Sequence, residues 1–200
     1  MGSNLYMNDG PPESGALIDE ILSGKKAAFR KLIEQNQRLV SHIIFRMVGD
    51  RQDREDLCQE VFVRVYRNLP NFRREAKLST WIARIAYNIG LSFVEKKNVP
   101  LVDETALDYE DTDMDMPLVA TPDVITEQKA ISGLVRDEID KLPVYYKTAL
   151  TLYHLDGMSY NEITDIMKVP EGTIKSYIFR GRKLLKERLL ARYSREDLWS

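Results

Sequence analysis

Apolar residues recur at the spacing of one helical face along the first half of the chain. One apolar stripe spans residues 29–47 and is followed by Gly49, which is a typical helix stop. A second spans residues 57–69, carries acidic residues just before it, where they favour a helix N-terminus, and is followed by Pro70. The pattern predicts two amphipathic helices joined by a short turn.

A third apolar stripe spans residues 81–93, and Ser79 or Thr80 is the N-cap that we expect for it. Residues 71–77 separate it from the second helix and form a basic loop that contains one aromatic residue. These three helices predict one small helical domain.

The second half of the chain predicts another group of helices. Residues 124–140 and 144–155 carry apolar positions at helical spacing, with Pro143 at a helix start, and these two helices form a supporting pair. Ser159 and Glu162 have the spacing of a capping box, and a short helix follows them. A tight turn at 169–173 then leads into a basic helix, so the pattern predicts a helix-turn-helix.

Composition supports an all-α fold of two small domains joined by a linker. Glycine and proline together number 18 in 200 residues, which is too few for a turn-rich β protein. Residues 101–123 hold eight acidic residues and no basic one, which is typical of an extended, flexible linker. We therefore divide the chain into a disordered tail (1–17), a first domain (18–100), the acidic linker (101–123) and a second domain (124–200).

Catalytic and metal chemistry is not indicated. The sequence has no glycine-rich phosphate loop, and one cysteine with two histidines cannot make a clustered zinc site, so we expect no cofactor, no metal, no small-molecule substrate and no enzymatic activity. Basic residues begin only at Lys25, and no apolar segment follows the N-terminus, so we expect no secretory signal and a cytoplasmic location.

Nucleic-acid binding is indicated by charge. Residues 168–192 hold eight basic and two acidic residues, which is the electrostatic footprint of a DNA-binding helix or, alternatively, a solvated helix face. Its outward side near the N-terminus presents four residues that suit base edges and phosphates: Lys175, Ser176, Phe179 and Arg180. For Phe179 the alternative is core packing.

The first domain also combines aromatic surface with positive charge, as proteins that hold unpaired bases do. The residues concerned are Phe72, Arg73, Arg74, Lys77, Trp81 and Arg84. Trp81 can equally be a core residue.

Two stretches of the first half resemble sigma factors of the extracytoplasmic-function (ECF) group. The segment 53–67, DREDLCQEVFVRVYR, is similar to their polymerase-binding helix, and 78–88, LSTWIARIAYN, to their promoter-melting helix. In the second half, LDGMSYNEI at 155–163 and GTIKSYIFRGR at 172–182 resemble their reader of the upstream promoter element. The resemblance covers residues 18–190 in the order and spacing of the family.

The resemblance implies a bacterial transcription initiation factor that binds the clamp of core RNA polymerase, opens the minus-10 element and reads the minus-35 element. It implies an anti-sigma partner as well, often bound to the inner membrane. By position, the implied polymerase contacts are Asp56, Gln59 and Glu60. The implied minus-10 contacts are Phe72, Arg73, Lys77, Trp81, Arg84 and Asn88. The implied minus-35 contacts are Thr173, Lys175, Ser176, Phe179 and Arg180.

Other functions are compatible with parts of the pattern. A stand-alone helix-turn-helix regulator accounts for the second domain but leaves Asp56, Gln59, Glu60 and the aromatic-basic residues of the first domain without a role. The acidic linker is expected either to occupy the RNA path of polymerase as an RNA-like polyanion or to be only a solvated spacer.

Overall fold

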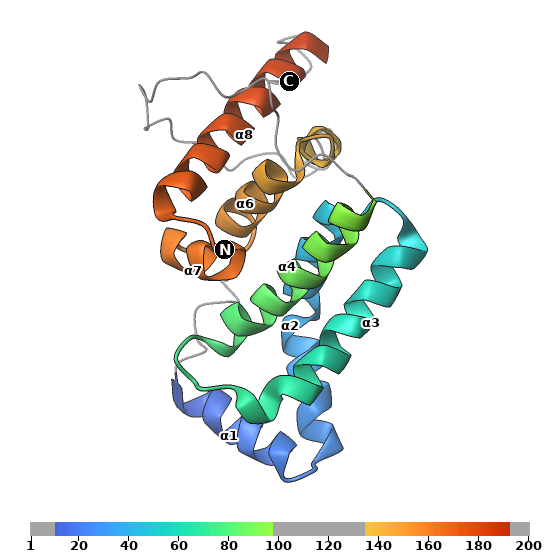
Figure 1. Cartoon of the computed structure of the whole chain (residues 1–200), viewed down its shortest axis with the longest axis vertical. Helices are drawn as coiled ribbons and strands as arrows, with labels where there is room; N and C mark the ends of the chain where they lie inside the picture. The colour runs from blue at the N-terminus through green and yellow to red at the C-terminus, as the bar shows by residue number, and fades with distance from the viewer. Residues whose placement is uncertain (1–10, 98–134, 193–200) are drawn as a thin grey trace, which may run out of the picture.

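The computed structural model describes residues 11–97 and 135–192, and the regular elements of these segments are helices (Figure 1). The N-terminal lobe consists of α1 (Pro11–Leu22), α2 (Lys26–Met47), α3 (Arg51–Asn68), the 3-10 turn η1 (Leu69–Asn71) and α4 (Leu78–Lys96). The C-terminal lobe consists of α6 (Val144–His154), α7 (Tyr160–Met167) and α8 (Glu171–Arg192), and residues 135–140 are also helical. The predicted all-α fold with a C-terminal helix-turn-helix is confirmed.

Helix α1 corrects the predicted N-terminal tail. The sequence predicts a disordered tail over residues 1–17, but residues 11–17 belong to α1. Leu17, Ile18 and Ile21 are buried, and α1 packs along α2. The large apolar residues of α1 all lie within residues 17–22, and the first five residues of the helix, PPESG, include two prolines and a glycine, so the apolar stripe is too short for a clear periodicity signal. Residues 1–10 and the acidic linker at 101–123 lie outside the described residues.

Side-chain caps begin α3 and α7 but not α4. The Asp53 backbone N–H donates to Asp50 Oδ1 at 3.0 Å, and the predicted capping box of Ser159 and Glu162 is confirmed. The expected cap of α4 is wrong, because this helix begins at Leu78 and its N-cap residue, Lys77, makes no side-chain cap. Thr80 is 4% exposed and contributes to the core instead.

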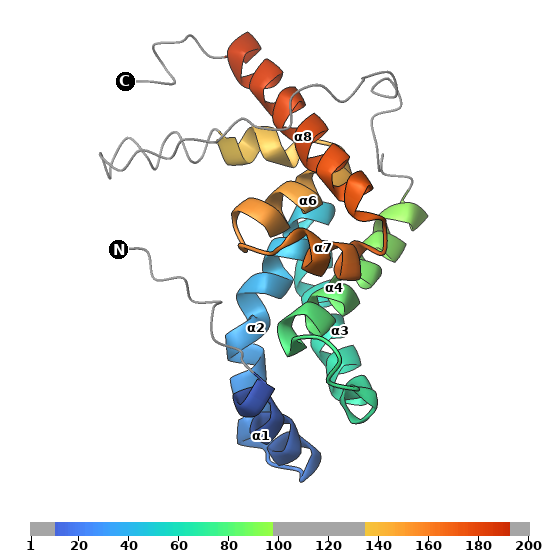
Figure 2. The same ribbon diagram turned by 90° about the vertical axis from the view of Figure 1, so that its left-hand side faces the viewer.

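The two lobes pack against each other. Helix α6 lies on α2, and α7 lies on α4, as the two views show (Figures 1 and 2). Buried apolar side chains of both lobes form one connected core cluster. We call this the closed arrangement. None of the helices in the described segments is long and apolar enough to cross a lipid bilayer.

Candidate functional site

The first candidate surface is the outer side of α3. Leu57, Val61 and Val65 are buried, which turns the opposite face of this helix to solvent. Asp56, Gln59 and Glu60, which the sequence predicts as polymerase contacts, are all exposed there. Gln52 Nε2 donates to Asp56 Oδ1 at 3.1 Å, and Arg64 Nη2 donates to Glu60 Oε1 at 2.6 Å. The two carboxylates are thus held in place by residues four positions away.

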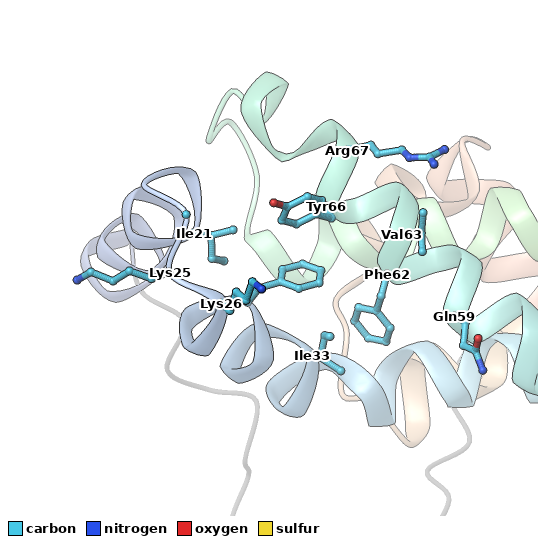
Figure 3. Close-up of a pocket in the computed structure, with 11 residues that line it drawn as sticks. Ile21, Lys25, Lys26, Ile33, Gln59, Phe62, Val63, Tyr66 and Arg67 are labelled. Carbon is cyan, nitrogen blue, oxygen red and sulfur yellow. The ribbon is translucent and has the colours of Figure 1, made fainter.

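An apolar groove of about 780 Å³ lies beside these residues, between α3 and the start of α2 (Figure 3). Its lining includes Ile33, Phe62, Val63 and Tyr66, and the Phe29 and Tyr66 rings meet edge-to-face with centroids 4.9 Å apart. Gln59 is the one predicted polymerase residue that also lines it, and basic side chains stand at its edge: Lys25, Lys26 and Arg67.

Sequence reasoning missed this groove, although a signal was available. Val63 is 49% exposed and Tyr66 is 54% exposed, and both lie off the apolar stripe of α3. Large apolar residues on the polar face of an amphipathic helix indicate a surface that another molecule covers.

The second candidate surface runs along α4. Lys77, Trp81, Arg84 and Asn88 follow one another at spacings of four, three and four residues, so they share one side of the helix. Lys77 and Asn88 are exposed, whereas Trp81 and Arg84 are partly buried. The structure therefore brings the predicted minus-10 residues of α4 together in one stripe.

Phe72 extends this stripe from the loop before α4. Its ring lies 5.0 Å from the Trp81 ring, centroid to centroid, and both side chains pack partly against the core. Trp81 therefore packs against the core cluster while part of the side chain remains exposed.

Helix α1 supports the same loop. Arg74 has the left-handed backbone conformation, with φ of 60°, and its Nη2 lies 2.5 Å from Asp19 Oδ1 of α1. Arg73 beside it is exposed. A left-handed arginine is strained relative to a helical or extended one, so its long-range contact with α1 helps to hold the loop in shape.

The third candidate surface is the N-terminal half of α8. Ile174 and Ile178 are buried, and Leu185 packs partly against the core. The predicted minus-35 residues are all partly exposed on the remaining sides of the helix: Thr173, Lys175, Ser176, Phe179 and Arg180. Lys175 Nζ is 2.8 Å from Glu171 Oε1, one turn earlier in the helix.

An aromatic and basic cluster adjoins Lys175, and the sequence did not predict it. Lys175 Nζ lies 5.5 Å from the Tyr160 ring centroid, and the Tyr160 and Tyr153 rings stack 4.9 Å apart. Arg182 lies over Tyr153 and donates from Nε to His154 Nε2 at 3.1 Å. Burial, and then the charge of Arg182, lower the pKa of His154, which keeps this imidazole neutral near pH 7.

Metal binding and thiol chemistry are not supported in the described segments. They contain no cluster of three or more histidine, cysteine and acidic side chains that could hold a metal ion. Cys58 is half-buried in α3, and burial raises the pKa of its thiol, which disfavours the reactive thiolate.

Comparison with protein families matches both lobes separately. Residues 32–98 match the family described as Sigma-70 region 2, and residues 132–185 match the family described as Sigma-70, region 4. These matches include the α3 and α4 surfaces in the first lobe and the start of α8 in the second.

Similar proteins extend over nearly the whole chain. The ECF RNA polymerase sigma-E factor of Haemophilus influenzae is 35% identical over 178 residues, which are 87% of this chain and 94% of that protein. The ECF RNA polymerase sigma factor SigW of Bacillus subtilis is 31% identical over 86% of this chain and 94% of its own length.

Two solved structures share the fold. CnrH in complex with the cytosolic domain of CnrY has a TM-score of 0.63 at 18% identity, covering 89% of this chain and 97% of that one. The sigma factor RpoE of Bartonella quintana, in complex with the anti-sigma factor NepR, has a TM-score of 0.56 at 21% identity, covering 82% of this chain and 98% of that one.

Proposed function

This chain belongs to the ECF RNA polymerase sigma factors, and from that premise we propose how its three surfaces divide the work of promoter recognition. In this proposal α3 binds core RNA polymerase, the α4 stripe takes the minus-10 element, and the start of α8 reads the minus-35 element. We assign the chain no catalytic step of its own, and we place its action in the bacterial cytoplasm.

The observation that carries the proposal is the sorting of predicted residues onto separate faces. The polymerase group and the minus-35 group each lie on the solvent-accessible side of one helix, α3 and α8, and the minus-10 group lies along one side of α4 and in the loop before it. The α4 stripe combines aromatic rings with Lys77 and Arg84, which suits stacked bases and their phosphates. The start of α8 offers donors on the N-terminal end of a helix-turn-helix second helix, which is the end that enters a major groove.

The groove beside Gln59 extends the proposed polymerase surface. Its apolar lining supplies area for burial, while Asp56 and Glu60 supply charges that fix the orientation of the partner. We propose that a helix of the polymerase clamp lies across α3 and covers both features.

Reversal of one charge tests this assignment. Glu60→Lys is expected to weaken binding to core polymerase by about tenfold or more, because it places like charges beside Arg64 and removes the carboxylate from the interface. The measurement is the affinity for core polymerase, with circular dichroism to show that the fold is kept. Glu34→Lys, at an exposed position of α2, is the matched control. Equal affinities of the two variants would contradict the assignment.

A transcription assay tests the function as a whole. Core polymerase plus this chain is expected to give run-off transcripts from a genomic library, and the transcripts would identify the promoters. A stand-alone helix-turn-helix regulator would instead bind duplex DNA without polymerase. That alternative is not favoured, since the relatives match both lobes and not only the second.

An anti-sigma partner is part of the proposal. It is supported by the fold, because the two solved structures with the same fold are complexes with an anti-sigma factor in one case and with the cytosolic domain of CnrY in the other. Co-purification from the native bacterium with mass spectrometry tests it, and attachment of the partner to the membrane is tested by fractionation of the same cells.

A further inference from the structure

Polar side-chain pairs join the two lobes in the closed arrangement. His42 Nδ1 of α2 lies 2.7 Å from Asp156 Oδ1, Arg46 of α2 pairs with Asp140, and Lys77 Nζ lies 2.9 Å from Glu162 Oε1 of α7. The side chain of Asp156 is 1% exposed, so its carboxylate is largely removed from water.

Apolar packing supports these pairs. Tyr87 of α4 is 2% exposed, and burial, together with the phenols of Tyr145 and Tyr177 from the other lobe, raises its pKa. Tyr177 lies on α8 among the predicted minus-35 residues, and its ring stacks on Tyr145 with centroids 5.4 Å apart. The contact between the lobes therefore involves both α4 and α8.

Lys77 takes part both in the contact between the lobes and in the proposed DNA surface. It is the N-cap residue of α4 and begins the stripe that continues through Trp81. Its partner Glu162 also accepts hydrogen bonds from the Ser159 backbone N–H and hydroxyl, at 2.9 and 2.8 Å. This capping box holds the carboxylate rigidly in front of the lysine.

We propose that Glu162 competes with promoter DNA for Lys77, so that α7 covers the end of the minus-10 surface until single-stranded DNA displaces it. The carboxylate stands where a DNA phosphate would otherwise pair with the ammonium group. The inference rests on the proposed function of the α4 stripe. The proposed competition is a separate role of Glu162, in addition to its part in the capping box of α7.

Linkage makes the proposal quantitative. If DNA binds Lys77 only in the open arrangement, the apparent affinity for DNA is reduced in proportion to the open fraction of the chain. A change that weakens closure without touching the DNA surface then tightens DNA binding, and DNA in turn weakens closure by the same factor.

Two variants separate this competition from a structural role. Glu162→Gln keeps the capping box, because glutamine serves at this position as glutamate does, but it removes the charge that faces Lys77. Lys77→Gln breaks the same pair from the other side and leaves the capping box untouched. Asp53→Asn is the control, since it breaks the 2.7 Å pair with Lys97 within the first lobe.

The distance between the lobes is measured first, by single-molecule fluorescence energy transfer without DNA or polymerase. Dyes are placed on exposed positions by Lys31→Cys on α2 and Glu187→Cys on α8, in a Cys58→Ser background. Glu162→Gln and Lys77→Gln are each expected to raise the open-to-closed ratio by about two- to fivefold, as for an ion pair that is partly exposed. Asp53→Asn is expected to leave it unchanged.

Affinity for DNA is then measured with a labelled single-stranded oligonucleotide of random sequence. Glu162→Gln is expected to bind about two- to fivefold more tightly than the wild type, whereas Lys77→Gln binds more weakly although it opens to the same extent. An unchanged lobe ratio in both folded variants overturns the proposal, and so does an open Glu162→Gln variant whose DNA affinity equals that of the wild type. Failure of the wild type to bind core polymerase would overturn the proposed function while leaving the lobe measurements as they stand.

Discussion

Helices α4 and α8 are both proposed to bind promoter DNA, yet they differ in how much of each helix the core uses. Nine of the 19 residues of α4 are buried, whereas only Ile174, Ile178 and Gly181 are buried among the 22 residues of α8. The proposed DNA stripe of α4 is therefore a narrow strip beside core residues, and Trp81 of this stripe also packs against the core. On α8 the proposed reading residues can change without disturbing the residues that hold the helix in place.

The strongest test of this difference is a core substitution on α4. Ile82→Ala is expected to lower the free energy of unfolding by about 2–5 kcal/mol, because Ile82 is 0% exposed and the substitution leaves a cavity. Urea denaturation measures the loss. If the loss stayed below about 1 kcal/mol, the packing of α4 would be looser than its burial indicates.

A reading residue on α8 is expected to behave in the opposite way. Arg180→Ala is expected to weaken binding to a minus-35 duplex by about 1–3 kcal/mol at particular base pairs, with the free energy of unfolding nearly unchanged. Affinities for a set of duplexes with single base changes decide this. A uniform loss over all sequences would show that Arg180 contacts phosphate, and a loss of stability would show that α8 is less separable from the core than proposed.

Two glycines sharpen the comparison at the points where each helix approaches a neighbour. A Cβ at Gly181 would lie 2.8 Å from Leu150 Cδ1 and 3.2 Å from Tyr146 Cβ, which is fixed to the backbone of α6. A Cβ at Gly90 would lie 2.7 Å from Sδ of Met47, in a flexible side chain. Gly181→Ala is thus expected to destabilise the fold by about 1 kcal/mol. Gly90→Ala is expected to cost less, because the flexible Met47 side chain can shift and the helix preference of alanine then offsets part of the cost.

Thermal unfolding of the two alanine variants gives the measurement. The reverse order of stabilities would mean that α6 moves more readily than Met47 does. In that case the packing between α8 and α6 would adjust to an added methyl group rather than resist it.

The smallest expected effect concerns the loop before α4. Asp19→Asn removes the charge that pairs with Arg74, and because both side chains are half exposed or more, we expect a stability change within about 1 kcal/mol. We expect a clearer decrease in open-complex formation, since the loop that carries Phe72 and Arg73 loses its ion pair with α1. Permanganate footprinting of the melted strand measures this, with Glu20→Gln, which breaks the local pair with Lys25, as control. Equal footprints would show that Asp19 does not position the loop.

The sequence predicted those parts of the molecule that depend on local pattern. The long stripes of α2 and α3 and the Ser159–Glu162 box are local, and they lie where they were expected. Helix α1 was missed because its large apolar residues span only residues 17–22, and their packing partners lie on α2. The N-cap of α4 was predicted wrongly, because Thr80, a residue type that often caps helices, is buried inside the helix instead.

The sequence predicts which residues belong to the candidate surfaces, but it does not predict how residues far apart in the chain are arranged around them. The spacing of Lys77, Trp81 and Asn88 places them on one side of a helix before any coordinates are known. Nothing local to Lys77 indicates that Glu162, 85 positions later, lies 2.9 Å from it. The groove beside α3 likewise needs α2 for one of its walls, so it exists only once the helices are packed.

The two lobes belong to one covalent chain, and this changes what their mutual contact has to achieve. Tethered surfaces meet at an effective concentration on the order of millimolar, so even contacts that would be too weak between separate molecules can keep the lobes together. A promoter is also bivalent, and it offers both lobes a binding partner at once. A stray sequence that matches one element competes for a single lobe and gains no avidity, so mass action alone favours DNA in which both elements are present.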